Sequence, residues 1–260
     1  MVISNFLENR ILPLRGIRVG ISGANGALGQ ALLKSFYNSG AHVVGITSSR
    51  TNTKVLDDRN HLIPVKWAIW KCGEEKKLAS FLKEIDLLII NHGTNNYKQQ
   101  YSQIVSTFMN VNAISSIRLL NLAINQTGWY REIWINTSEA EVQPAFSPLY
   151  EISKRLIGQL SSLYNCGFYF SQGIRIRKLV LGPFNSRLNP IGIMTPDFVA
   201  QQIIYQAKMG MGLIIVSPNP LTYVLMPIVE FTRWIYYTGL MRKVDFKSYD
   251  QSIFHSHQKL

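Results

Sequence analysis

The sequence predicts an α/β protein built on a doubly wound parallel sheet, in a single domain with a C-terminal apolar helical extension. Short β-branched runs alternate with amphipathic segments along most of the 260 residues, as expected for strands and helices of such a sheet. A glycine-rich turn at residues 22–29 separates the first run from the first amphipathic segment. The order of strand, glycine turn and helix predicts an anion-binding site at the start of that helix.

Strands are predicted at residues 16–22, 41–47, 62–70, 86–93, 132–137, 173–181 and 212–217. The intervening residues 27–38, 74–84, 103–125, 149–163 and 196–209 have helical spacing of apolar side chains, and Thr195 is in position to cap the last of these helices. Ligands bind beyond the carboxyl ends of the strands in such sheets. We therefore expect a site formed by residues 23–29, 47–50, 91–93 and Ser138.

The glycine turn is the predicted phosphate cradle. Gly23, Gly26 and Gly29 allow a sharp turn and a close approach to a pyrophosphate, and Asn25 and Leu28 belong to the same segment. The free N–H groups and the positive dipole at the start of the helix would hold the anion. A dinucleotide cofactor is the expected ligand, and an ordinary strand-to-helix turn is the alternative.

The end of the second strand decides between the two nicotinamide cofactors. An acidic residue there would bind the adenosine ribose, whereas a base accepts a 2′-phosphate. This chain has Thr47, Ser48, Ser49 and Arg50, with no acid. The sequence therefore favours NADP(H) over NAD(H).

Tyr150 and Lys154 are the predicted proton-transfer pair. Positions i and i+4 share one face of a helix, so both side chains can point into the same cleft. A nearby ammonium favours the phenolate and lowers the pKa of a tyrosine towards a range useful for acid–base catalysis. The alternative is a surface tyrosine beside a solvated lysine.

Several motifs together resemble the short-chain dehydrogenase/reductase family, over residues 18 to about 217. They are the glycine turn, Asn91-His92-Gly93 in place of the family's Asn-Ala-Gly, Asn112 within Asn-Val-Asn-Ala, Ser138, and Tyr150 with Lys154. The resemblance implies a Rossmann-like fold. The glycine spacing is closer to that of the extended or atypical members, which include sugar-nucleotide epimerases.

The resemblance also implies roles for these residues. Tyr150 would be the general acid or base, and Lys154 would also hydrogen-bond the nicotinamide ribose. Ser138 would orient the substrate oxygen, although Thr137 is an alternative for that hydroxyl. Asn112 would hold a water in a proton path behind Lys154, or else simply bond to backbone. Further cofactor contacts are expected from Asn91, Gly93 and Pro183.

Composition excludes some function classes and favours others. The net charge of +12 favours anionic partners, but no nucleic-acid-binding motif is present and we expect no nucleic-acid partner. Cys72 and Cys166 lack metal-ligand spacing, so no metal site is expected and a reducing, cytoplasmic location fits. The first ten residues do not resemble a signal peptide. A homo-oligomer, a dimer or tetramer, is expected from the family resemblance.

The chain divides into a dinucleotide-binding domain, residues 1–220, and an apolar and basic extension, residues 221–260. In residues 221–240, Pro227, Glu230 and Arg233 argue against a membrane-spanning helix. Glu230, Arg233 and Tyr237 would form a narrow polar stripe beside a broad apolar face. Two interpretations stay open: a helix that covers the substrate pocket or a partner subunit, and an interfacial helix in peripheral contact with a membrane through residues 221–243.

The leading functional hypothesis is an NADP(H)-dependent oxidoreductase that transfers hydride between nicotinamide and a carbonyl or alcohol of a small or lipophilic substrate. One alternative is a catalytically silent dinucleotide-binding regulatory or scaffold protein of the same fold. A second alternative is an epimerase or dehydratase, which the glycine spacing suggests.

Overall fold

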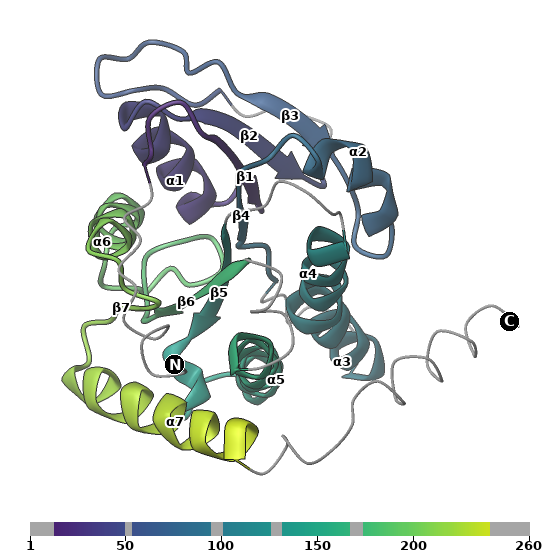
Figure 1. Ribbon diagram of the computed structural model, residues 1–260, viewed down its shortest axis with the longest axis vertical. Coiled ribbons are helices and arrows are strands. Elements are labelled where there is room, and N and C mark those ends of the chain that lie inside the picture. The colour runs from purple at the N-terminus through teal and green to yellow at the C-terminus, as the bar shows by residue number, and fades with distance from the viewer. Residues whose placement is uncertain (1–12, 50–53, 95–100, 126–131, 167–173, 240–260) are drawn as a thin grey trace, which may run out of the picture.

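The computed structural model describes residues 13–49, 54–94, 101–125, 132–166 and 174–239 (Figure 1). Seven parallel strands form one sheet in the order β3-β2-β1-β4-β5-β6-β7. Their bounds are Arg18–Ser22 (β1), His42–Thr47 (β2), Lys66–Ile69 (β3), Leu87–Ile90 (β4), Glu132–Ser138 (β5), Arg175–Leu181 (β6) and Leu213–Val216 (β7). The predicted doubly wound sheet is confirmed.

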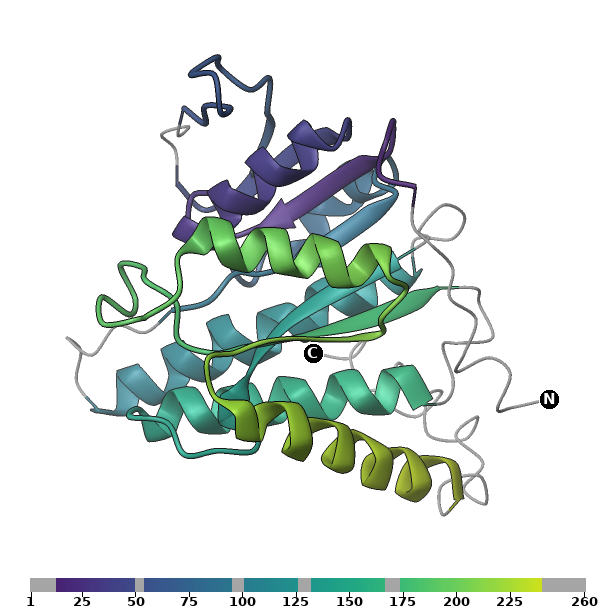
Figure 2. The same cartoon turned by 90° about the vertical axis from the view of Figure 1, so that its left-hand side faces the viewer.

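The helices cover both faces of this sheet. They are Ala27–Asn38 (α1), Ala79–Leu82 (α2), Tyr101–Met109 (α3), Ser115–Asn125 (α4), Pro148–Cys166 (α5), Pro196–Lys208 (α6) and Pro220–Gly239 (α7). One core cluster lies between the sheet and α1 and α6, and a second lies between the sheet and α2, α4 and α5 (Figures 1 and 2). Thr195 caps α6 as predicted, because its hydroxyl accepts a hydrogen bond from the Phe198 amide over 3.2 Å.

Three predicted elements differ from the structure. The predicted helix 103–125 contains a π-helical turn, Asn110–Ile114, between α3 and α4. The predicted helix 74–84 is a 3-10 turn, Glu75–Leu78, followed by the single turn of α2. The predicted strand 62–70 narrows to β3, since Pro64 lacks the amide hydrogen that a strand ladder needs.

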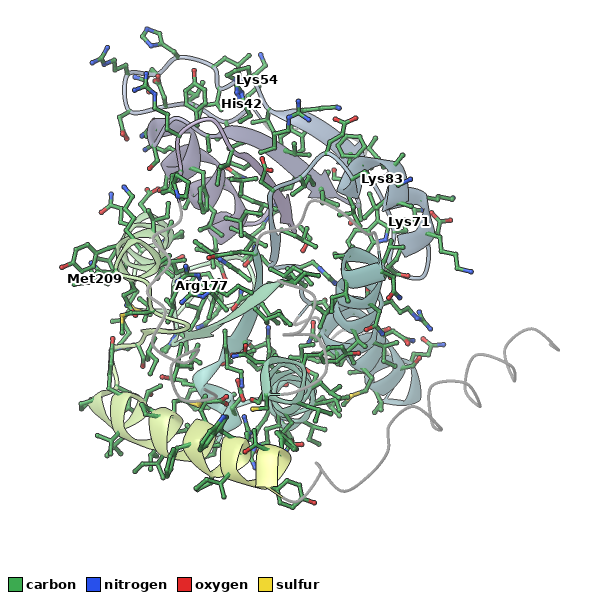
Figure 3. All side chains as sticks on the ribbon, in the orientation of Figure 1. His42, Lys54, Lys71, Lys83, Arg177 and Met209 are labelled. Carbon is green, nitrogen blue, oxygen red and sulfur yellow. The ribbon has the colours of Figure 1, made fainter. Side chains whose placement is uncertain are left out.

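Strand β6 carries two charged residues into the interior. Arg177 is fully buried and binds Glu132 of β5 through Nε at 2.6 Å and Nη2 at 2.8 Å. Figure 3 shows Arg177 well inside the molecule, unlike the labelled lysines at its rim. The neighbouring Lys178 binds the carboxylates of Glu141 and Glu230 at 3.0 and 2.8 Å. Both cations are paired, as burial of a charge requires.

Helix α7 packs along α5 and β7 (Figure 1). It contains Pro227 in its interior and is 20 residues long. Among the described residues, no helix combines the length and apolar character needed to cross a bilayer.

Candidate functional site

The site lies where the strand order reverses, between β1 and β4. From β1 the chain moves outward to β2 and β3, then returns to place β4 on the other side of β1. The loops that follow β1 and β4 therefore diverge at their carboxyl ends, which is the usual position for a dinucleotide in an open α/β sheet. The predicted residues after β1, β2, β4 and β5 meet along this edge.

Two glycines of the first turn are required by close packing. Gly23 has φ of +68°, and a Cβ there would lie 2.8 Å from the Cα of His92. A Cβ on Gly29 would lie 2.3 Å from the carbonyl oxygen of Gly23. A larger residue at either position would push β1, α1 or β4 apart, so these glycines set the tight turn.

The start of α1 has the features of an anion site. Gly26 is the exposed N-cap residue, and no side chain caps this end of the helix. The side chain of Leu28 is buried in the core, so only its backbone faces the turn. Gln30 donates to the carbonyl oxygen of Asn25 over 2.9 Å and braces the loop. The residues present fit a pyrophosphate, which uncapped helical N–H groups bind well.

The end of β2 lies beside this turn. The amide of Ala24 donates to the carbonyl oxygen of Ile46 over 3.2 Å. Thr47 is buried and its hydroxyl accepts a hydrogen bond from the Ser49 amide at 3.1 Å, while Ser48 is exposed. Arg50 lies outside the described residues. The described part of this segment contains no carboxylate, in keeping with the predicted preference for a 2′-phosphate.

His92 joins the end of β4 to β1. Its Nδ1 lies 2.8 Å from the hydroxyl of Ser22, and its ring meets Trp70 edge-on with centroids 4.9 Å apart. The Ser22 hydroxyl also accepts a hydrogen bond from the Asn91 amide over 2.9 Å. Burial, and secondarily the charge of Lys154, lower the pKa of His92 to about 3. The imidazole is thus a neutral structural group behind the glycine turn.

Asn136 connects β4, β5 and α5, although the sequence analysis did not identify it. Its Nδ2 donates to Asn91 Oδ1 over 2.8 Å, and its carbonyl oxygen accepts a hydrogen bond from Lys154 over 3.1 Å. Its Oδ1 is buried, and none of the described residues donates to it. The only sequence signal was a polar residue near the end of an apolar strand. A ligand with a hydrogen-bond donor would satisfy this oxygen.

Tyr150 and Lys154 lie one turn apart on α5, as predicted. The ammonium of Lys154 is 5.7 Å from the centre of the Tyr150 ring. Lys154 is buried and Tyr150 is half-buried. Burial lowers the pKa of Lys154 to about 8, while the carboxylate of Glu141 acts in the opposite direction. The pair places a cation beside a phenol that solvent and substrate can reach.

The two candidate hydroxyls at the end of β5 are engaged differently. Thr137 is buried and donates to the carbonyl oxygen of Leu179 over 3.1 Å. Ser138 makes a longer 3.4 Å bond to Leu181 and accepts a hydrogen bond from the Ala140 amide over 3.2 Å. Since successive residues of a strand point to opposite faces, only one of them can face a given ligand. Because the hydrogen bond donated by the Ser138 hydroxyl is the longer of the two, Ser138 is the better candidate for donating to a substrate oxygen.

Asn112 stands in the π-helical turn and braces the loop after β4. Its Oδ1 accepts a hydrogen bond from the Thr94 amide at 2.7 Å, and its Nδ2 donates to the Thr94 carbonyl oxygen at 3.0 Å and to the Ser153 hydroxyl at 3.3 Å. A Cβ on Gly93 would lie 3.3 Å from the same Oδ1. Asn112 therefore bonds to the backbone, as one of the two predicted interpretations requires. Its role in a proton path behind Lys154 stays a prediction.

The remaining predicted contact, Pro183, begins the loop between β6 and α6. Its carbonyl oxygen accepts hydrogen bonds from the amides of Ile193 and Met194 at 3.2 and 3.4 Å, which fold residues 183–194 into a closed loop. Leu188, Ile191 and Ile193 are exposed on it. This apolar loop stands at the carboxyl end of the sheet, next to the predicted site (Figure 2).

Glu141 is a second residue that sequence reasoning missed. It follows β5 in a short 3-10 turn, Glu139–Glu141, and its side chain is fully buried. Its Oε2 binds Lys178 at 3.0 Å and Arg233 of α7 at 2.9 Å. Through its charge it also acts on Lys154. Glu141 therefore links the proton-transfer pair to the helix that closes this side of the protein.

Comparison with known proteins agrees with this geometry. The model of the NAD dependent epimerase/dehydratase family matches residues 19–164. A monoglucosyldiacylglycerol epimerase from Synechocystis sp. is 40% identical over 237 residues, which are 89% of this chain and 57% of the epimerase. The chain spans about half the length of the curated relatives that it matches.

Two solved structures illustrate the likeness in fold. A ketone-specific alcohol dehydrogenase from Comamonas testosteroni has a TM-score of 0.69 at 17% identity, covering 88% of this chain and 94% of that one. A short chain dehydrogenase from Burkholderia cenocepacia, solved in complex with NADP, has a TM-score of 0.68 at 15% identity, covering 88% and 99%. The expected resemblance to short-chain dehydrogenases is confirmed at the level of the fold.

Proposed function

The chain belongs to the NAD dependent epimerase/dehydratase family, and we propose that it is a nicotinamide-dependent epimerase acting on the hexosyl headgroup of a glycolipid. The observation that carries this proposal is that Tyr150 and Lys154 lie at the same carboxyl edge of the sheet as a glycine turn that fits a pyrophosphate. The substrate class is supported by 40% identity to a monoglucosyldiacylglycerol epimerase. The epimerase alternative is therefore preferred to net carbonyl reduction, which the sequence alone had favoured.

The cofactor that these residues fit is NADP(H), with NAD(H) as the less favoured alternative. Gly23, Gly26 and the first turn of α1 would hold the pyrophosphate, and Thr47 and Ser48 would lie by the adenosine ribose. Two proteins of the same fold were solved with NADP or NADPH. When bound, the nicotinamide supplies reversible hydride exchange with a substrate carbon.

The proton chemistry falls to residues of this chain. Tyr150 takes the proton of the sugar hydroxyl when the carbon is oxidised to a ketone, and returns it when the ketone is reduced from its opposite face. The Lys154 ammonium, 5.7 Å from the Tyr150 ring, would favour the phenolate form, and the Ser138 hydroxyl would donate to the substrate oxygen. Since one proton and one hydride are removed and one of each is returned, the cycle consumes no net reductant.

The test is a conversion assay with monoglucosyldiacylglycerol in mixed micelles. Purified protein and catalytic NADP⁺ should yield the epimeric headgroup, resolved by chromatography after hydrolysis, with no net change in absorbance at the wavelength of reduced nicotinamide. Tyr150→Phe should abolish conversion, and Tyr205→Phe, on the exposed side of α6, should not. Continuous oxidation of NADPH with simple ketones would favour the reductase instead. Binding of a nucleotide without any conversion would favour the silent dinucleotide-binding protein, and failure to bind either nucleotide would refute the redox function.

A further inference from the structure

Helix α7 carries its charges towards the protein. Its sequence contains only two charged residues, Glu230 and Arg233. The guanidinium of Arg233 binds Glu230 Oε1 at 2.8 Å and Glu141 Oε2 at 2.9 Å, and Lys178 binds Glu230 Oε1 at 2.8 Å. Thr222 and Met226 are also buried on this side. Both charged residues of α7 thus lie on its inner side, whereas an ordinary surface helix carries its charges outward.

The outer side of α7 is correspondingly apolar and aromatic. Five of its side chains recur at three- and four-residue intervals, so that they form one stripe along the helix: Leu221, Val224, Ile228, Phe231 and Ile235. They are between 49% and 60% exposed, and Tyr223 and Tyr236 flank them at 48% and 54%. Figure 1 shows this helix at the rim of the molecule, with α5 next to it on the side towards the centre. A stripe of this length, about 30 Å for 20 residues, exceeds what scattered surface residues produce.

The apolar stripe of α7 begins next to the loop that follows β5 and Ser138. Gln143, in the loop after β5, donates from Nε2 to the Thr222 hydroxyl over 2.8 Å. The Ser217 hydroxyl, just before α7, donates to Glu139 Oε2 at 2.5 Å. Phe146 in the same loop after β5 is fully exposed. The first turn of α7 is therefore fastened to the loop that follows Ser138, at the carboxyl edge of the sheet.

The loop between β6 and α6 adds to this edge. Ile191 and Ile193 are each 77% exposed, Leu188 is 47% exposed, and Arg187, which precedes Leu188 in the chain, is exposed as well. Figure 2 shows this loop and the start of α7 on the same side of the molecule. Apolar side chains accompanied by a surface cation suit the boundary between lipid headgroups and acyl chains.

We propose that the outer side of α7 lies flat in the interface of an anionic lipid bilayer. In this position the protein would bring the headgroup of a membrane lipid to the site. The lipid substrate rests on the proposed function, whereas the docking rests on α7 itself. Charge decides between a bilayer and a second copy of this chain. Two copies would each carry +12, whereas an anionic bilayer complements that charge. The ion pairs of Glu230 and Arg233 with Glu141 and Lys178 keep α7 on the protein, so it lies in the interface rather than across the bilayer.

Co-sedimentation of the full chain with vesicles tests the docking. We expect binding to vesicles of phosphatidylcholine mixed with phosphatidylglycerol, and much weaker binding to phosphatidylcholine alone. Ile228→Ser combined with Phe231→Ser should weaken binding about tenfold or more, because both outward apolar groups are lost. The matched control, Tyr205→Ser with Met209→Ser, removes exposed apolar groups from α6 and its C-cap and should bind as the unaltered chain does. Circular dichroism confirms that each variant is folded.

Three results would overturn the docking proposal. The first is an unaltered chain that stays in the supernatant with both kinds of vesicle, and the second is a double variant that sediments as well as the unaltered chain. The third is a dimer, by light scattering, that the Ile228→Ser and Phe231→Ser changes convert to a monomer, because α7 would then pair two copies. A short-chain, water-dispersed monoglucosyldiacylglycerol separates this question from catalysis. The α7 double variant should convert it normally, whereas absence of conversion by the unaltered chain would refute the proposed function and leave the vesicle result standing.

Discussion

The ammonium of Lys154 donates to the carbonyl oxygen of Asn136 over 3.1 Å, which ties the middle of α5 to the end of β5. This bond holds the cation within the protein while one turn of helix separates it from Tyr150. An ammonium has three donors, so two remain for a ligand and for the phenol. Burial lowers the pKa of Lys154 only to about 8, so the ammonium is still mostly charged at neutral pH, as a partner for a phenolate must be.

Replacing Tyr150 by phenylalanine should remove catalysis without removing the cofactor site. The ring is kept, but the group that exchanges the proton is lost, and general acid–base catalysis contributes about 10²–10⁴-fold to rates. We expect turnover to fall by at least about 10²-fold. Titration with NADPH, followed by nicotinamide fluorescence, should give an unchanged dissociation constant. A variant that retains full turnover would remove Tyr150 from the mechanism.

His92 should make the protein sensitive to acid. Its pKa is about 3 when folded against 6.5 as an ordinary value, so between these pH values the unfolded chain binds a proton that the folded chain does not. The stabilisation is complete above pH 6.5 and is lost as the pH falls towards 3, by about 1.4 kcal/mol per pH unit. Urea unfolding across this range should show a smaller slope for His92→Asn. The control His42→Asn, at an exposed position of β2, should keep the slope of the unaltered chain.

Removing the cation of Lys178 should be far more damaging than removing a surface cation. Lys178 is buried and donates to Glu141, Glu230, Ser162 and the Gly158 carbonyl oxygen. We expect Lys178→Met to lower the free energy of unfolding by about 3–5 kcal/mol, because the buried carboxylate of Glu141 and the partly buried one of Glu230 each lose a partner. The control is Lys66→Met on β3, whose pair with Glu84 is exposed and worth about 1 kcal/mol or less. Equal losses in chemical denaturation would show that the buried network is not stabilising.

Gly158 should be intolerant of even one added methyl group. A Cβ at this position of α5 would lie 2.0 Å from the carboxyl carbon of Glu141, which packs against the helix there. Gly158→Ala must displace either Glu141 or α5, at a cost of about 1–3 kcal/mol. The comparison variant is Gly212→Ala, where an added Cβ meets nothing within 4 Å. Thermal unfolding of both variants decides the matter, and a Gly158→Ala protein as stable as Gly212→Ala would contradict the close approach.

The sheet was predictable because its central strands are short β-branched runs between turn residues. Runs such as Val43–Val44 and Leu87–Ile90 are buried on both faces, and a parallel sheet needs that pattern. The ends of the elements were harder to predict. Strand β3, for example, begins only at Lys66, because Pro64 has no amide hydrogen to donate to a strand ladder. The π-helical turn at Asn112 was not predictable either, because it depends on side-chain bonds to Thr94 and to Ser153 of another helix.

The candidate site was predictable only where a residue acts through its own segment. The glycine turn and the Tyr150–Lys154 pair are local patterns, and the structure brings them to one edge. Asn136 and Glu141 act through contacts with distant parts of the chain, such as the pair of Glu141 with Lys178, 37 residues away. The sequence marks both as polar residues near a strand end and cannot say what they contact.

The sequence predicts a broad apolar face on α7, but it does not show whether that face points towards the protein or away from it. When the helix is considered alone, Glu230 and Arg233 would be expected to face solvent. Their partners, Glu141 and Lys178, come from the turn after β5 and from β6. Those long-range ion pairs turn the polar stripe inward and expose the apolar stripe.

We expect this chain to remove and return the same hydride at a sugar carbon, and isotope labelling of the substrate distinguishes that from exchange with solvent. Monoglucosyldiacylglycerol deuterated at every ring carbon would be incubated with the protein and NADP⁺ in ordinary water. We predict an epimeric headgroup of unchanged mass, because the label leaves as hydride and returns to the same carbon. An epimer that has lost one deuterium to solvent, or a nucleotide-bound protein that forms no epimer, would contradict the account.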